Sequence, residues 1–215
     1  MENIITTLIY IHAGFGGIAL FAGLISLIVK KGNTIHKRSG LVFFYAMLCS
    51  GLIALIVSCL PGHESPFLFA IGIFSLYFVL SGYRALRFKK PNINLTLDTW
   101  ISRMMILTGI LMIVLPMVNS GKLNIVLSVF GAFGIYFAIR DLRLYKDPKK
   151  VRKSWLKIHL GKMIGGYIAA TTAFVVVNGF FPGISGWFIP SVIGGIYIVY
   201  WMRKVTKKTP ASINT

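Results

Sequence analysis

Histidines with basic neighbours are the residues of this 215-residue sequence whose types and spacing could support chemistry. His36 opens the stretch "HKRSG" between two long apolar runs, and His159 precedes "GKM" at the start of a later run. His12 lies well inside the first apolar run, whereas His63 stands in the polar stretch "PGHESP". Imidazole is the commonest metal ligand and titrates near neutral pH. We therefore expect His12, His36 and His159 to be the candidates for a ligand or proton role, and His63 to be solvated.

Depth separates these histidines. If the apolar runs are helices, His36 and His159 fall at the same basic level, and His12 lies roughly 25 Å along its helix from that level. His12 therefore cannot share a metal ion with the other two. His36 and His159 can meet if the second and sixth helices are neighbours. His12 and His36 each precede a glycine by four residues and lie on a row of small residues, so both should face protein and not lipid.

Two chemistries fit this pattern. In one, His36 and His159 are the axial ligands of a b-type haem, and Arg38, Arg103 and Lys162 contact its propionates. His12 would then be a ligand at a second site.

In the other chemistry, the cationic groups around His36 hold an anion, such as a lipid headgroup or a small phosphorylated solute. The residues expected in that cluster are Arg38, Arg103 and Lys162. A simpler interpretation makes His36 and His159 interfacial anchors and gives His12 a structural hydrogen bond. A zinc site is disfavoured, because no cysteine or carboxylate is placed to complete a ligand set.

The elements that position these residues are membrane helices. The sequence is 56% hydrophobic and 13% charged, about half the charge of a soluble domain. Apolar runs of a length that crosses a bilayer recur from end to end. We predict an all-α bundle of seven transmembrane helices that forms a single integral membrane domain over residues 1–215. The predicted spans are 4–29, 40–60, 67–86, 101–118, 123–139, 159–180 and 188–201.

The charge distribution predicts the orientation. The net charge is +18, and when alternate loops are assigned to opposite sides, Lys122 alone among the 23 lysines and arginines falls on the sparsely charged side. The positive-inside rule then places the N-terminus outside and the C-terminus in the cytoplasm. This distribution argues against nucleic-acid binding, and it predicts anionic lipid headgroups as partners on the cytoplasmic side.

The junctions "YRALRFKKP" and "IRDLRLYKDP" resemble each other, and each is followed by a tryptophan. They indicate three repeated hairpins followed by a last helix. All five acidic residues are expected in loops, at helix ends or at membrane interfaces, and no P-loop, GxSxG or HExxH motif is present. The sequence thus offers no hydrolase or nucleotide-binding signature, and an enzymatic role would be that of a redox module.

The elements "IHAGFGGIALFAG" and "HKRSG", with the arginine–tryptophan junctions, resemble a bacterial family of multi-helix inner-membrane proteins that share a domain of unknown function. The resemblance extends over most of the chain and implies an inner-membrane bundle without an assigned activity. "HKRSG" is also similar to helix starts of membrane b-type cytochromes and ferric reductase-like domains. Three functions stay open: binding or transport of a small molecule, anion or lipid; haem-based electron transfer; and a structural or assembly role.

Overall fold

The structure is a computed structural model that describes residues 2–207. These residues form seven α-helices and one short 3₁₀ helix, and each of the seven is long and apolar enough to cross a membrane. The predicted all-helical fold with seven spans is confirmed. The elements are α1 (Glu2–Ile28), α2 (Thr34–Val57), α3 (Pro66–Arg84), η1 (Ala85–Lys89), α4 (Thr96–Ser120), α5 (Ile125–Tyr145), α6 (Pro148–Val177) and α7 (Ser185–Lys207).

Two helices begin well before the predicted starts at Gly40 and His159. The side chain of Asn33 accepts a hydrogen bond from the His36 amide at 2.7 Å and caps α2. The side chain of Asp147 accepts one from the Lys150 amide at 3.0 Å and caps α6. These caps satisfy amides that have no partner within the helix, so the helices extend through polar turns that a hydropathy pattern does not include. His36 is therefore in the first turn of α2, and His159 lies about three turns inside α6.

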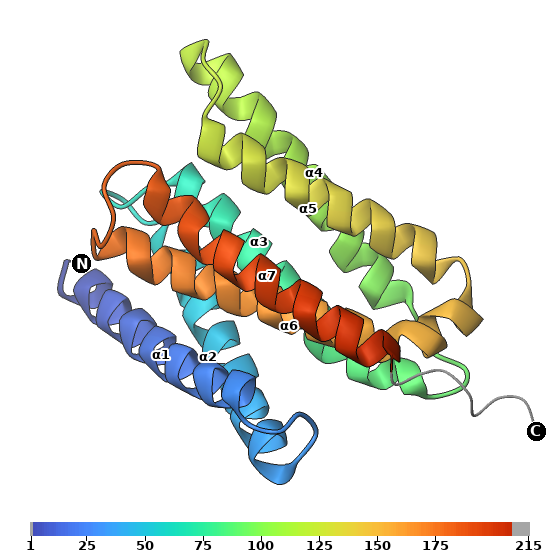
Figure 1. The fold of residues 1–215 in the computed structure, drawn as a ribbon. Coiled ribbons are helices and arrows are strands. Elements are labelled where there is room, and N and C mark those ends of the chain that lie inside the picture. Colours follow the sequence, from blue (N-terminus) through green and yellow to red (C-terminus); the bar gives the residue numbers. More distant parts are fainter. Residues whose placement is uncertain (1, 208–215) are drawn as a thin grey trace, which may run out of the picture.

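α3 and α6 form the centre of the bundle (Figure 1). The α1–α2 hairpin lies on one side of this pair and the α4–α5 hairpin on the other, while α7 runs along α6. α3 carries the longest set of buried residues, because it packs against helices from both hairpins. The bundle core is thus built around the two central helices.

The packing departs from the three hairpins expected from the repeated junctions. The junctions join α1 to α2, α3 to α4 and α5 to α6, but the hairpins that pack most closely are α1–α2, α4–α5 and α6–α7. α3 pairs mainly with α6. Glycines explain this arrangement: a Cβ built on Gly166 would lie 2.7 Å from Val79, and one on Gly109 would lie 2.8 Å from the Gly131 carbonyl oxygen. Backbones approach closely where such residues meet.

The connections α1–α2 and α5–α6, together with η1 and the last turns of α7, lie at one end of the bundle, which we call the cationic end. Lys122, in the α4–α5 turn, lies at the opposite end. Lys208, which the sequence assigns to the basic side, lies outside the described residues.

The rows that carry His12 and His36 face the interior as predicted, and a face of α6 is buried as well. Ala19 and Gly23 of α1 are buried against α2 and α6, and Phe44 and Met47 of α2 belong to the same buried cluster. In α6, Ala169 is buried in the cluster shared with α3 and α5. The histidines on these rows therefore have protein neighbours.

Candidate histidine site

α1 and α2 hold their histidines by reciprocal bonds. His12 Nδ1 of α1 lies 2.9 Å from the Ser50 carbonyl oxygen of α2, and His36 Nδ1 of α2 lies 3.0 Å from the Ser26 carbonyl oxygen of α1. Each serine follows its own helix's histidine by the same interval, with a glycine four residues after each histidine. The two antiparallel helices thus carry one pattern, H-x₃-G-x₉-S, and exchange equivalent contacts.

His159 is held in the same way by the central helix pair. Its Nδ1 lies 2.8 Å from the carbonyl oxygen of Gly82, close to the end of α3. A Cβ on Gly82 would lie 3.0 Å from the Lys162 Cβ and 2.9 Å from the Met163 sulfur, so α3 and α6 approach closely beside this bond.

The three carbonyl contacts favour one tautomer of each imidazole. A carbonyl oxygen can only accept a hydrogen bond, so the bond forms when Nδ1 of His12, His36 or His159 carries the proton. Nδ1 of His12 and His36 also lies 2.9 Å and 3.0 Å from the hydroxyl oxygens of Ser50 and Ser26. In this tautomer Nε2 has a free lone pair. Most metal-ligating histidines are oriented in this manner, by a backbone carbonyl or carboxylate on the second ring nitrogen.

His36 and His159 line one cavity, which we call the histidine cavity. It has a volume of about 550 Å³ and lies between α1, α2, α3, η1 and α6 at the cationic end. This volume is within the range of small-molecule and cofactor sites. The structure thus brings together the two histidines that were expected to share a membrane level. His12 is not among the residues that line this cavity, in agreement with its different depth.

Lysines and aromatic rings surround the histidine cavity. Lys31, Lys37 and Lys89 line it, and the Lys89 ammonium lies 4.0 Å from the centre of the Trp155 ring. Lys31 Nζ donates to the carbonyl oxygens of Ser26 (2.8 Å) and Leu27 (2.6 Å) at the end of α1. Burial lowers the pKa of the Lys31 ammonium to about 8. Its attraction for an anion is therefore present at neutral pH and weakens as the pH rises through that value.

The structure does not bring Arg38, Arg103 and Lys162 together around His36. Arg38 and Arg103 are exposed, and neither lines the histidine cavity. The Arg103 guanidinium lies 5.6 Å from the centre of the Trp100 ring, on a helix that packs mainly against α3 and α5. Lys162 lies on another side of α6 from His159 and lines a second cavity.

Lys162 is buried and already paired. Its ammonium lies 2.6 Å from an Asp141 carboxylate oxygen and also donates to the Tyr77 hydroxyl, which itself donates to the same oxygen at 2.6 Å. Three helices, α3, α5 and α6, thus meet in one polar triad. Because its charge is compensated, Lys162 is poorly suited to the anion contact predicted for it.

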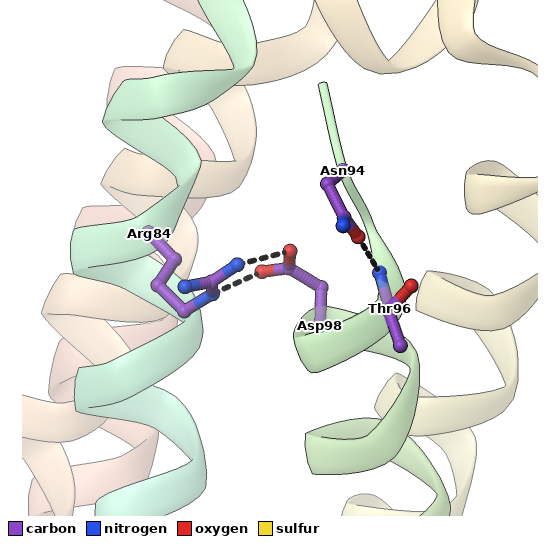
Figure 2. A network of polar contacts seen from close by, with 4 residues as sticks. All are labelled: Arg84, Asn94, Thr96 and Asp98. Atoms are coloured by element: carbon purple, nitrogen blue, oxygen red, sulfur yellow. Dashed lines mark hydrogen bonds and ion pairs between the residues drawn. The ribbon is translucent and has the colours of Figure 1, made fainter. Parts of the chain in front are cut away.

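A second ion pair, between a partly buried arginine and a buried aspartate, joins α3 to α4 (Figure 2). Arg84 donates through Nε and one terminal nitrogen to both oxygens of Asp98, each at 2.7 Å, and the Asp98 side chain is 1% exposed. Asn94 accepts a hydrogen bond from the Thr96 amide at 2.9 Å and supports the chain just before this turn. The bidentate geometry is the strongest form of such a pair, and it fixes the junction next to η1.

The sequence predicted that Asp98 and Asp141 lie near helix ends. In the structure Asp98 is in the first turn of α4, and Asp141 is four residues before the end of α5. What the sequence did not indicate is that both carboxylates are buried and paired. Their scarcity was the available signal: three acidic residues, Asp98, Asp141 and Asp147, lie among many cations at one end of the bundle, and each has a cationic partner.

A family model covers residues 9–129, which is more than half of the chain. The chain belongs to the family of predicted membrane proteins DUF2306. The matched range contains His12, His36 and the Arg84–Asp98 pair, and it ends before His159 and Lys162. The family is one of multi-pass membrane proteins of unknown function, so it confirms the predicted resemblance without assigning an activity. No curated protein and no solved structure gives a significant match to the chain.

Proposed function

We propose that this protein is a haem-binding electron-transfer module of the membrane, in which His36 and His159 would hold one b-type haem. The observation that carries the proposal is the placement of two imidazoles, each with Nδ1 held by a carbonyl and Nε2 free, on the wall of one cavity. Ligands fixed in this way lose little conformational freedom when they bind a metal.

The number of ligands distinguishes haem from a bare metal ion. A protein site for a bare transition metal has three or four side-chain ligands, whereas a haem iron takes its remaining ligands from the porphyrin and needs only two axial groups. Cofactor sites in helix bundles are built from side chains on facing helices, and histidine is a common ligand of haem iron. His36 and His159 would supply the two ligands that a haem iron needs from the protein.

The lysines of the histidine cavity support the same function. Haem carries two propionates, and Lys31, Lys37 and Lys89 line the cavity at its cationic end. These three replace Arg38, Arg103 and Lys162 as the propionate contacts that we propose. The aromatic rings of Trp155 and Tyr83 also line the cavity and provide flat surfaces against which a porphyrin could pack. Bound haem would supply one-electron chemistry, and the chain's own residues would orient it and shield it from water.

This function fits the structure better than the anion cluster expected from the sequence. Two of that cluster's members are exposed and outside the cavity, and the third has a carboxylate partner. We further propose that the cationic end faces the cytoplasm of a bacterial inner membrane and contacts anionic lipid headgroups, since the lysines and arginines gather at that end.

The visible spectrum of the full chain tests the proposal. Protein expressed with ample haem and purified in mild detergent should show a Soret band, and reduction by dithionite should sharpen its visible bands. His36→Ala and His159→Ala should each lose the bound haem, because one axial ligand is removed. His12→Ala should keep it, because His12 does not line the cavity.

A thermal unfolding measurement on the same preparations separates loss of haem from loss of fold. His159→Met offers a second check, because a thioether can ligate haem iron and would change the reduction potential while retaining the cofactor. A colourless wild-type protein, or a band that persists in both alanine variants, would refute the assignment.

A further inference from the structure

We propose that a second cavity binds one acyl chain of an anionic amphiphile, with the anionic head at Arg140, Arg143 and Lys157. This cavity, which we call the aromatic cavity, has a volume of about 740 Å³ and lies between α3, α5, α6 and α7. It is distinct from the histidine cavity, and the proposal does not depend on haem.

The inner wall of the aromatic cavity is mainly apolar, and the Lys162–Asp141 pair that also lines it is already internally compensated. Phenylalanines from three helices line it, with Phe74 and Phe78 on α3, Phe130 and Phe137 on α5, and Phe188 on α7. A polar solute would lose its hydration on entering such a space without gaining hydrogen bonds. A hydrocarbon chain is the chemistry that this wall favours.

The rim of the cavity is cationic and is not neutralised. Arg140, Arg143 and Lys157 line it, and among the described residues none of them forms an ion pair with a carboxylate. Asp141 is the acidic residue of the lining, and its carboxylate is engaged by Lys162. The rim therefore has net positive charge, which complements a carboxylate or phosphate head.

The lengths also agree. From Arg140 to Val129, the deepest lining residue of α5, the helix rises by about 16 Å. The hydrocarbon thickness of one leaflet is about 15 Å, half that of a typical bilayer. An amphiphile with its head at the cationic end would thus extend one chain along the full apolar wall.

Spin-labelled stearate tests this inference in nanodiscs of zwitterionic phosphatidylcholine that contain the full chain. The nitroxide is placed near the chain end, and the pH keeps the carboxylate ionised. We expect an immobilised population in the electron paramagnetic resonance spectrum. Arg140→Gln/Arg143→Gln should weaken this binding by about tenfold, because two charge-assisted contacts are lost.

The matched control is Arg152→Gln/Lys153→Gln, which removes the same charge from exposed residues of α6 that do not line the cavity. It should leave stearate binding unchanged. Gly195→Trp is a second variant that keeps all charges: Gly195 lines the cavity, and a Cβ there would meet no atom within 4 Å. The added ring should reduce the immobilised population by occupying the space.

Spin-labelled stearyl alcohol has the same chain as stearate but no charge. Its binding to the wild type should be as weak as the binding of stearate to Arg140→Gln/Arg143→Gln, or weaker. Competition by unlabelled stearate would indicate a free fatty acid, and competition by phosphatidylglycerol in the disc would indicate a bilayer lipid; both have the proposed chemistry. Equal binding of the alcohol, or unchanged binding in both the arginine and Gly195 variants, would overturn the proposal. A thermal unfolding midpoint confirms that each variant is folded, and the result is independent of any Soret band.

Discussion

At the scale of residues, the buried carboxylates and the buried lysine among residues 2–207 each have a partner of opposite charge. Asp141 and Lys162 are both nearly inaccessible, and Asp98 and Arg84 are held by two short bonds. Removing an ion from water is costly, and its partner offsets that cost only when the geometry is good. The pairs should therefore tolerate joint replacement better than the loss of one member.

Asp141→Asn should destabilise the protein by about 3–5 kcal/mol, because Lys162 would remain buried without a compensating charge. Thermal and denaturant unfolding in detergent would measure the change. Asp141→Asn/Lys162→Met should recover most of the loss. A double variant no more stable than Asp141→Asn would show that the triad does not act through charge compensation.

Several features of the histidine site could be predicted from residue spacing. The shared level of His36 and His159 followed from their places in the basic junctions, and the protein-facing position of His12 from its row of small residues. The carbonyl partners could not be predicted, because they depend on which helices are neighbours and at what register. The pairing of Asp141 with Lys162 was hidden for the same reason.

At the scale of elements, glycines determine which helices pack closely. A Cβ on Gly109 would lie 2.8 Å from the Gly131 carbonyl oxygen, and one on Gly131 would lie 2.7 Å from the Gly109 carbonyl oxygen. The two backbones therefore touch where α4 crosses α5. This contact holds the α4–α5 hairpin together, while α5 diverges from α6 and leaves the aromatic cavity between them.

Gly109→Ala should push α4 away from α5 and destabilise the protein by about 1–3 kcal/mol, the usual cost of overpacking. Gly17→Ala is the matched control, since a Cβ at Gly17 would meet no atom within 4 Å. Unfolding midpoints of the two variants provide the comparison. If the two variants had equal stability, the α4–α5 contact would not be as close as the structure shows.

Helix number was predictable at this scale, but helix boundaries were less so. The apolar runs predict seven helices, because a helix that crosses the lipid bonds all of its backbone polar groups within its own segment. The starts of α2 and α6 extend into basic turns that hydropathy does not register. Asn33 and the Asp147–Pro148 pair are capping signals that would have located them.

At the scale of the whole molecule, seven membrane-spanning helices would place Glu2, at the start of α1, and Lys207, at the end of α7, on opposite sides of a membrane. A reporter that works only in the cytoplasm should be active when it is fused to the C-terminus. A reporter that works only outside the cytoplasm should be active when it is inserted at Lys122, because the basic residues gather at the opposite end of the bundle. The two fusions report opposite ends of the same bundle. The reverse pattern of activities would contradict the proposed orientation.

The arrangement of the helices was the part that the sequence left undetermined. The repeated junctions suggested that α3 pairs with α4, the next helix in the chain. In the structure α3 packs more extensively on α6, which is distant in the chain. In lipid, apolar surface does not by itself select partners, so small steric features decide. The steric fit between two helices can be recognised only when the structure shows both helices of the pair.

The position of α6 between the two cavities has a thermodynamic consequence. His159, Met163 and Tyr167 face the histidine cavity, whereas Lys162 and Ala169 face the aromatic cavity. One helix is therefore a wall of both cavities, so a ligand that displaced it on one side would alter the affinity on the other. Linkage would make this influence reciprocal: if the proposed acyl chain changed the affinity for the proposed cofactor by some factor, the cofactor would change the affinity for the acyl chain by the same factor.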